Sequence, residues 1–280
     1  MLWLVLQACL VMVIWGSVPS VIKIIPTNPI VIGIVRLVIA GVILLFFSRA
    51  HAELRNLGQR DWFYFVALGV CFGIHWLTYF YSIRISTPSI AAIGLSSYGV
   101  HLVLLSRFYY GSRIGLMQLI SIGLAITGSL CLVPKFDLNN QIAQGLILGF
   151  LSSFAFALLP ILHKASQHVS SRTRTLAQFA FALPVFLPFL DRANVEIAAS
   201  DWLWLIYLAV VATALAHFMW VRVSTELSTS LTGVLYYLWV PAAMTFSALL
   251  SGEIVNTRLI LGGGLVIAGS ILGVKHSRVS

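Results

Sequence analysis

The chain has 280 residues, of which 60% are hydrophobic and only 9% are charged. An ordinary soluble domain carries about 25% charged residues, because charge must cover its surface. This composition disfavours a soluble enzyme, a disordered chain and a nucleic-acid-binding protein, and it predicts an all-α integral membrane protein. The formal net charge of +9 fits, since Lys and Arg gather in the cytoplasmic loops of membrane proteins.

Ten apolar segments follow one another along the chain, separated by prolines, glycines and charges. A helix needs about 20 apolar residues to cross a bilayer. The sequence therefore predicts ten transmembrane helices, at residues 2–22, 29–47, 62–81, 87–106, 114–133, 143–163, 175–190, 202–221, 228–250 and 258–274. The first is interpreted as a retained helix and not as a signal peptide, because the N-terminus lacks a basic region and a small-residue cleavage site.

Loop charge predicts the orientation of these helices. With both termini in the cytoplasm, eleven Lys and Arg residues fall on the cytoplasmic side and five on the opposite side. This excess follows the positive-inside rule. We expect a multi-pass protein of the cell's inner (plasma) membrane, surrounded by lipid, with its N- and C-termini in the cytoplasm.

The sequence repeats itself at a constant offset. The pair Pro19 and Lys23 corresponds to Pro160 and Lys164, and further collinear matches follow. These matches join Gly123, Gly128 and Ser129 to Gly264, Gly269 and Ser270. The interpretation is a duplication into residues 1–138 and 139–280, with five helices in each. Because five is odd, the second copy is inverted in the membrane, which is a common architecture of secondary transporters.

Several motifs have a familiar form. WGSVPSVIK at 15–23, followed by Arg36-Leu37 and Ala40, resembles the opening of an EamA-type repeat of the drug/metabolite transporter (DMT) superfamily. LLSGE at 249–253 and the glycine-rich last segment, 262–273, resemble its close. The resemblance implies a ten-helix permease with two inverted five-helix repeats around a central cavity. It also implies small metabolites, such as amino acids, as cargo.

Three positions depart from the pattern of that family. Gly99 and Ser112 stand where a proline and a glutamate are usual, and Pro241 lies one residue later than the usual proline. These departures leave the fold expectation intact, but they mean that no particular substrate can be carried over.

Arg36 lies within a predicted span, seven residues past Pro29. That distance is about 10 Å along the helix axis. A charge at this depth is costly and is a functional candidate by default. It is either a counter-charge for a substrate carboxylate or phosphate, or a structural arginine that bonds carbonyls of a neighbouring helix.

Histidines and aromatic residues supply the other candidates. Three histidines lie deep within predicted spans, where a neutral imidazole can bind a substrate, pass a proton or simply pack. Aromatic residues with polar tips that need partners are concentrated in the same helices, among them Tyr236. The candidates for the cavity, besides Arg36, are Trp15, His75, Trp76, Tyr79, Tyr98, His101, His217, Trp220, Tyr237 and Trp239.

None of the eight acidic residues falls in the middle of a predicted span. Proton-driven export of organic cations generally uses a buried carboxylate, which loses its proton to bind the cation. The sequence therefore disfavours a multidrug cation pump. Facilitated diffusion, exchange and proton coupling through histidine remain as alternatives.

The leading hypothesis is a secondary or facilitative transporter of small amino-acid-like metabolites, neutral, zwitterionic or anionic, that works by alternating access. A flippase for lipids or lipid-linked sugars is the alternative, because such proteins share related folds. A membrane enzyme is less favoured, because HExxH, DxxD and CxxC patterns are absent. No metal, cofactor or nucleic-acid partner is expected. The substrate, the direction of transport and the oligomeric state stay open.

Overall fold

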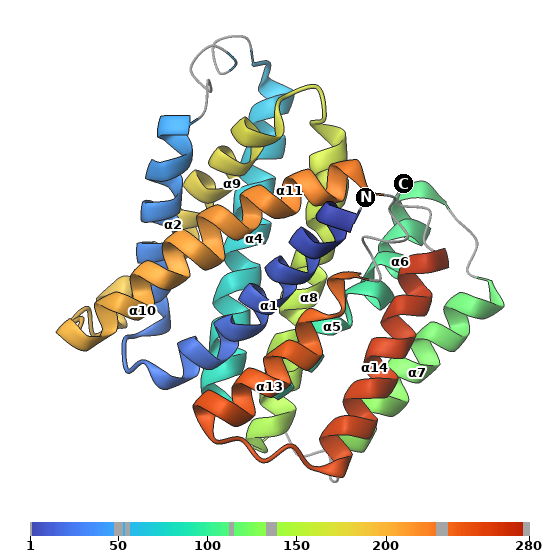
Figure 1. Ribbon diagram of the computed structural model, residues 1–280. Helices are drawn as coiled ribbons and strands as arrows, with labels where there is room; N and C mark the ends of the chain where they lie inside the picture. Colours follow the sequence, from blue (N-terminus) through green and yellow to red (C-terminus); the bar gives the residue numbers. More distant parts are fainter. Residues whose placement is uncertain are drawn as a thin grey trace.

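The protein is represented by a computed structural model that describes residues 2–47, 53, 57–111, 115–132, 139–227 and 235–276. Every regular element in these ranges is helical (Figure 1). Seven helices of the described chain are long and apolar enough to cross a membrane, and three shorter apolar helices accompany them. Ser112 and residues 228–234 of the predicted ninth span lie outside the described residues.

The first half of the chain forms helices close to the predicted segments. They are α1 (Leu2–Ile24), α2 (Pro29–Phe47), α4 (Gln59–Ile85), α5 (Pro88–Ser96), α6 (Tyr98–Tyr110) and α7 (Leu116–Leu132). The predicted span 87–106 is divided into α5 and α6 by a turn at Ser97, whose backbone ψ of 0° interrupts the helix. Pro88 stands in the first turn of α5, where its missing N–H costs nothing, and the Thr87 hydroxyl accepts a bond from Ile90 N–H.

The second half is less regular. Its helices are α8 (Gln141–Ala165), α9 (Ser171–Phe186), η1 (Leu187–Arg192), η2 (Ala199–Asp201), α10 (Trp202–Ile206), η3 (Tyr207–Leu215), α11 (Ala216–Glu226), α13 (Trp239–Ser251) and α14 (Thr257–His276). The predicted segment 175–190 becomes α9 followed by the 3-10 turn η1, which begins just before Pro188. The predicted segment 202–221 is one long rod in which α10 and α11 flank the π-helix η3.

Helices α7 and α14 cross at glycines. A Cβ on Gly128 would lie 2.5 Å from the carbonyl oxygen of Gly262, and a Cβ on Gly269 would lie 2.6 Å from that of Ser121. The two helices can approach so closely only because these positions carry no side chain. The Ser121 hydroxyl also donates to the Gly269 carbonyl at 2.7 Å.

When each residue at this crossing is replaced by its equivalent in the sequence repeat, each of the two contacts becomes the other. The offset of the repeat, which takes position 19 to position 160, takes Gly128 to Gly269 and Ser121 to Gly262. The contact of Gly128 with Gly262 therefore becomes the contact of Gly269 with Ser121. The two helices run antiparallel there, which is the arrangement that a two-fold axis between them would produce.

Other helix pairs follow the same exchange. Helix α4 packs on α8 as α11 packs on α1, and α6 packs on α8 as α13 packs on α1. The C-terminal ends of α6 and α13 also correspond, because Gly111 and Gly252 both adopt the left-handed conformation, with φ of 66° and 65°. A glycine tolerates this conformation without the penalty that other residues incur.

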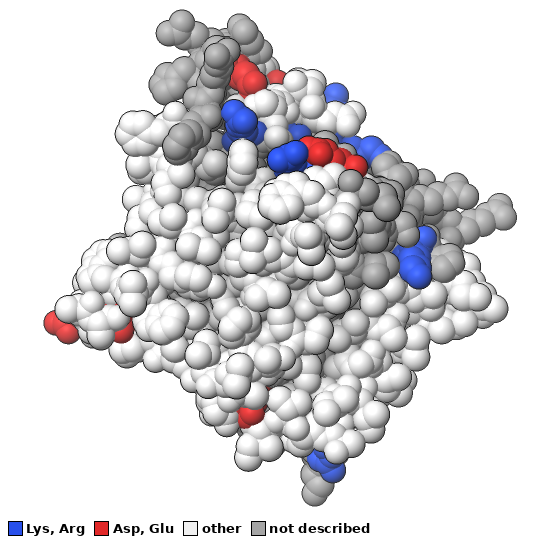
Figure 2. Space-filling model, in the orientation of Figure 1, with Lys and Arg blue, Asp and Glu red and all other residues white. Residues whose placement is uncertain are grey.

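The surface has an uncharged band between charged ends. In Figure 2, most Lys and Arg side chains gather toward the upper end, where some acidic side chains also lie, and the left and lower edges carry further acidic and basic side chains. Figure 1 shows that the start of α1 and the end of α14 both lie toward the upper end. A wide apolar band flanked by charge matches the hydrocarbon and headgroup layers of a bilayer.

Two polar contacts tie the loop between α8 and α9 to neighbouring segments. His168 Nε2 lies 2.8 Å from Asp61 Oδ1, and the Ser170 hydroxyl donates to Glu53 at 2.8 Å. Hydrogen bonds from Thr173 and Ser170 lower the pKa of the Glu53 carboxyl. A lowered pKa in the folded state means that this contribution to stability is present above the usual pKa of Glu and is lost as the pH falls.

We predict that Gly128→Ala and Gly269→Ala will each lower the free energy of unfolding by about 1–3 kcal/mol, because the added methyl group meets backbone atoms that cannot rotate away. The matched controls are Gly123→Ala and Gly264→Ala, which lie on the same helices, are also equivalent in the repeat, and have nothing within 4 Å of an added Cβ. Thermal unfolding in detergent measures the effect. Equal melting temperatures for all four variants would contradict the proposed role of the crossing.

Candidate functional site

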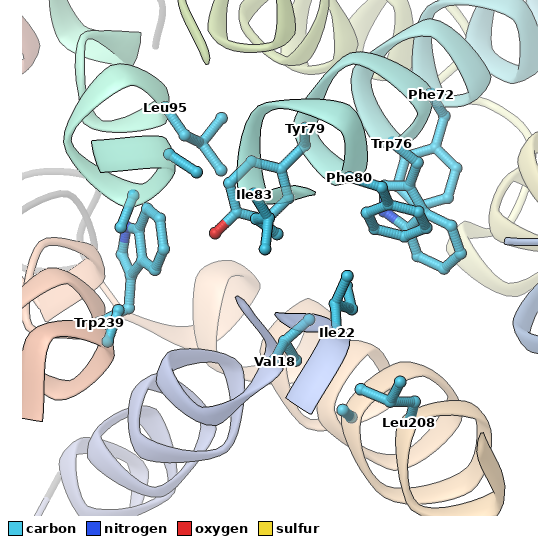
Figure 3. Close-up of a cluster of buried hydrophobic side chains, with 14 of the residues drawn as sticks. Val18, Ile22, Phe72, Trp76, Tyr79, Phe80, Ile83, Leu95, Leu208 and Trp239 are labelled. Atoms are coloured by element: carbon cyan, nitrogen blue, oxygen red, sulfur yellow. The ribbon is translucent and has the colours of Figure 1, made fainter. Parts of the chain in front are cut away.

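A cavity lies between α1, α2, α4, α5, α8, α11 and α13. Its volume is about 80 Å³, enough for several water molecules. Figure 3 shows part of its wall, with Tyr79 turned toward Trp239 and with Phe72, Trp76 and Phe80 side by side on α4. The lining residues are Trp15, Val18, Arg36, Phe72, His75, Trp76, Tyr79, Phe80, Leu95, Phe156, His217, Tyr236 and Trp239. None of them is acidic.

Arg36 is the one charged residue of this lining, and only 3% of it is exposed. Its guanidinium carbon lies 4.1 Å from the centroid of the Trp76 ring and 5.4 Å from that of Phe80. A cation over an aromatic face is stabilised by about 2 kcal/mol or more when both are shielded from water. The Nε atom donates to the Thr213 hydroxyl at 3.0 Å, while Nη1 is buried without a hydrogen-bond partner.

His75 and His217 present acceptors to this site. The Ser152 hydroxyl donates to the His75 carbonyl at 2.9 Å, so at 2.7 Å from Nδ1 its oxygen accepts the ring N–H. His217 Nδ1 lies 2.8 Å from the Thr213 carbonyl oxygen, which can only accept. Both rings thus carry their proton on Nδ1, and in the uncharged ring Nε2 is left as an acceptor.

Two more polar atoms of the wall lack partners within the described structure. The Tyr79 hydroxyl and Trp239 Nε1 are buried without a hydrogen bond. Together with Arg36 Nη1 they form a group of donors, and the two imidazoles offer acceptors. A buried polar atom without a partner costs about 1–3 kcal/mol, more for a charged group. The wall is therefore suited to a small ligand that supplies both acceptors and donors.

The structure brings seven of the eleven sequence candidates to the cavity wall and places four behind it. Tyr98 packs on Phe156 with ring centroids 5.3 Å apart, and Trp220 lies 5.5 Å from Trp15. The hydroxyl of Tyr237 accepts a bond from Gly99 N–H at 3.1 Å. These side chains support the residues of the wall.

His101 is the fourth of these and lies apart from the cavity. Its Nδ1 lies 3.0 Å from the Ser153 hydroxyl on α8, and its ring centroid lies 5.7 Å from that of Phe154. Ser153 directly follows Ser152, the partner of His75, so two histidines of the first half contact adjacent serines of α8.

Six lining residues were not among the candidates: Val18, Phe72, Phe80, Leu95, Phe156 and Tyr236. One of them could have been found from the repeat, because its offset takes the candidate Trp15 to Phe156. The same offset takes Leu95 to Tyr236, so two equivalent pairs line the cavity. The others are ordinary apolar residues, whose orientation depends on how the helices are rotated against one another.

The ends of α1 and α4 cap each other below the cavity. Lys23 Nζ donates to the carbonyl oxygens of Ile83, Arg84 and Ser86, at 3.1, 3.1 and 2.6 Å. In return, Arg84 Nη2 donates to the carbonyl oxygens of Ile25 and Thr27, each at 2.6 Å. Each basic side chain thus satisfies carbonyls that the other helix leaves free at its end. We call these contacts the reciprocal cap.

Two acidic residues lie near the reciprocal cap. Asp201 Oδ2 accepts bonds from the Thr27 hydroxyl at 2.5 Å and from the Thr27 N–H at 3.2 Å. Glu253 accepts from Ser89 N–H and from the Ser247 hydroxyl. Polar contacts therefore link α1, α4, α5 and α13 with the start of α10 at this end. Ile22 and Ile83, one helical turn beyond the wall residues Val18 and Tyr79, are fully buried, so the cavity is closed there.

A metal site finds no support in the described residues, because no group of three or more His, Cys, Asp or Glu side chains there could hold an ion. The three cysteines are free. The chemistry of the cavity is that of a binding site made from one cation, neutral donors, imidazoles and aromatic faces.

The sequence profile of the EamA-like transporter family matches residues 2–133 and again residues 143–274. This chain belongs to the EamA-like transporter family. It is a multi-pass membrane protein, and its family is one of transporters.

Relatives of this transporter have names of the same kind. A "probable amino-acid metabolite efflux pump" of Salmonella typhimurium is 27% identical over 97% of this chain and 95% of its own. A protein of that name in Escherichia coli is 27% identical over 95% of this chain and 93% of its own. A "probable biotin transporter" of Pseudomonas aeruginosa is 26% identical over 49% of this chain and 51% of its own.

A solved structure has the same fold. Its TM-score to this transporter is 0.66 at 16% sequence identity, and the match covers 99% of this chain and 96% of the other. At this identity the likeness concerns the fold alone. It shows that the whole chain follows an arrangement already seen in a crystal structure.

We predict that Arg84→Ala will open the end of the transporter that the reciprocal cap closes. The substitution frees the carbonyls of Ile25 and Thr27 and removes a contact between α1 and α4. A cysteine placed at Ile22, which is fully buried, should then react with a water-soluble thiol reagent at least several-fold faster, with Cys9, Cys71 and Cys131 replaced by serine. The control is Arg258→Ala, which removes an exposed arginine. An unchanged rate in Arg84→Ala would contradict the prediction.

Proposed function

We propose that this transporter carries small amino-acid-like metabolites, whose carboxylate binds Arg36, across the inner membrane by alternating access. The observation that supports this most directly is the buried Nη1 of Arg36, a charged donor without a partner at the wall of a cavity that has no acidic residue. Such a charge is expensive to keep in an apolar interior. A ligand carboxylate would supply the missing counter-charge and acceptor.

The other wall residues fit the remainder of such a ligand. The imidazole Nε2 atoms of His75 and His217 can accept bonds from an ammonium or amide group. The faces of Trp15, Phe156 and Tyr236 can hold an apolar side chain, and aromatic faces also attract a ligand ammonium. A lone organic cation would face Arg36 without a carboxylate to balance its charge. The site thus favours zwitterions and anions over simple amines.

The proposed transport cycle rests on ten helices in two inverted repeats, residues 1–138 and 139–280. The exchange of contacts between α7 and α14 and the two matched segments of the family profile support this duplication. In the conformation described here the reciprocal cap closes one end, so access to the cavity from that end requires α1 and α4 to separate. Rocking of one repeat against the other would alternate this closure.

We predict that Arg36→Gln will weaken binding of a transported amino acid by about 10-fold to 100-fold, because a charge-assisted hydrogen bond is lost. Arg36→Lys should retain part of the affinity, since the charge remains. Proteoliposome uptake and equilibrium binding of L-alanine, L-serine and L-leucine measure the effect, and the amide of each amino acid serves as a probe that lacks the carboxylate. Arg172→Gln, at an exposed position, is the control.

A separate measurement shows whether Arg36→Gln is still folded. Replacing a buried arginine that lacks a carboxylate partner by a neutral residue should leave the melting temperature unchanged or raise it. A stable variant that binds the amino acids as tightly as the native protein would refute the role of Arg36. Native protein that binds and transports none of the three amino acids would refute the proposed cargo.

We also predict that both termini are cytoplasmic. Reporter tags at residues 1 and 280 should be reached only from the cytoplasm, and single cysteines at Asn194 and Asn256 should be labelled only from the opposite side. Asn194 lies in the loop that follows η1, and Asn256 lies in the loop that follows α13. A result that places the two termini on opposite sides would rule out ten spans and the inverted repeat with them.

A further inference from the structure

The long rod of the eighth predicted span contains a π-helix, η3, beside the cavity. In such a segment the hydrogen bonds reach back five residues, which changes the carbonyls that are bonded within the helix. Ala216 N–H bonds to Val211 and Thr213 carbonyls and so passes over the carbonyl of Ala212. The Thr213 hydroxyl donates to the Leu208 carbonyl, also five residues back, at 2.7 Å.

The two consecutive residues Ala212 and Thr213 hold three side chains of the cavity wall. The indole Nε1 of Trp15, on α1, donates to the Ala212 carbonyl at 3.1 Å. Arg36 Nε, on α2, donates to the Thr213 hydroxyl at 3.0 Å, and His217 Nδ1, on α11, donates to the Thr213 carbonyl at 2.8 Å. Side chains from three helices thus depend on one π-helical turn.

Thr213 is fully buried, and its hydroxyl is bonded both as a donor and as an acceptor. Its one hydrogen is committed to the Leu208 carbonyl, so the oxygen can only accept from Arg36. This fixes the direction in which the guanidinium lies. With Nε anchored in this way and the guanidinium carbon 4.1 Å from the centroid of the Trp76 ring, the buried Nη1 is left as a donor for a ligand.

We infer that Thr213 is a positioning residue of the binding site, which orients Arg36 toward a ligand carboxylate, and that η3 exists in π-helical form to present it. The inference rests on the proposed function, because it concerns the same carboxylate. Trp15 and His217 are oriented by the same turn, so η3 sets the specificity of the wall as a unit. A regular α-helix there would return the Ala212 carbonyl to Ala216 N–H, so Trp15 would have to share this acceptor.

The other half of the chain lacks this device. In the register that aligns Asp61 with Asp201, the equivalent of Thr213 is Gly73, which lies in the regular helix α4 and packs against Val185. Glycine offers no hydroxyl, and the repeat equivalent of Arg36 is Ala177. The threonine and the arginine that it orients are therefore each missing from the equivalent place in the other half.

The test compares Thr213→Val with Thr213→Ser. Valine keeps the shape of the side chain and removes the acceptor, whereas serine keeps the hydroxyl. We expect Thr213→Val to weaken binding of L-alanine, L-serine and L-leucine by about three-fold to ten-fold, and to leave binding of their amides unchanged. Thr213→Ser should bind as the native protein does. The control is Thr245→Val, an exposed threonine whose hydroxyl bonds to the Pro241 carbonyl in its own helix.

A double-mutant cycle separates positioning from a general structural role. In the Arg36→Lys background the Nε donor is gone, so Thr213→Val should weaken binding less than two-fold further. Equal weakening in both backgrounds would overturn the inference. Equal loss of amino acids and amides, or no loss in Thr213→Val, would overturn it as well. If Thr213→Val does not fold, Thr213→Cys replaces it, because a thiol is a poorer acceptor of similar size.

One measurement needs no ligand. In protein labelled with ¹⁵N-arginine, the Arg36 Nε–H resonance, assigned through its loss in Arg36→Lys, should exchange slowly in the native protein and in Thr213→Ser. It should exchange at least several-fold faster in Thr213→Val. Slow exchange in Thr213→Val overturns the inference even if the amino acids bind. Native protein that shows the expected exchange but binds none of the amino acids overturns the proposed cargo and leaves the positioning of Arg36 established.

Discussion

The buried charge of Arg36 determines how the centre of this transporter is built. An arginine deep in an apolar protein must be compensated by aromatic faces, polar neighbours or a ligand. Here Trp76 and Phe80 provide aromatic faces, Thr213 provides one acceptor, and no carboxylate of the cavity lining provides the rest. The compensation within the protein is therefore incomplete, and Nη1 is left without a partner.

Around this centre several packing features recur at equivalent positions of the two halves of the chain. Small residues allow α7 and α14 to touch at two exchanged pairs of positions, and left-handed glycines end α6 and α13 alike. Packing without side chains at a crossing depends on van der Waals contact and not on apolar burial, which is weak inside lipid. The frame is thus held by its smallest residues, while the largest ones surround the cavity.

Much of the fold could be predicted from the sequence, because spans such as 29–47 and 143–163 are set by length and hydrophobicity alone. The offset of the repeat could also have identified Phe156 from Trp15. The division of the fourth span at Ser97 and the π-helix at 207–215 could not, because both depend on contacts from other helices. Polar atoms were the reason to expect four further residues at the cavity: Tyr98, His101, Trp220 and Tyr237. The rotation of each helix decides which of two neighbouring residues faces inward, and at the cavity this is Tyr236 and not Tyr237.

The absence of a second arginine at Ala177 gives the chamber a permanent polarity. The cavity lining carries its positive charge on one side only, at Arg36 of α2. A zwitterion held there would keep its negative head with the first half whichever face of the membrane is open, so it would cross without turning over.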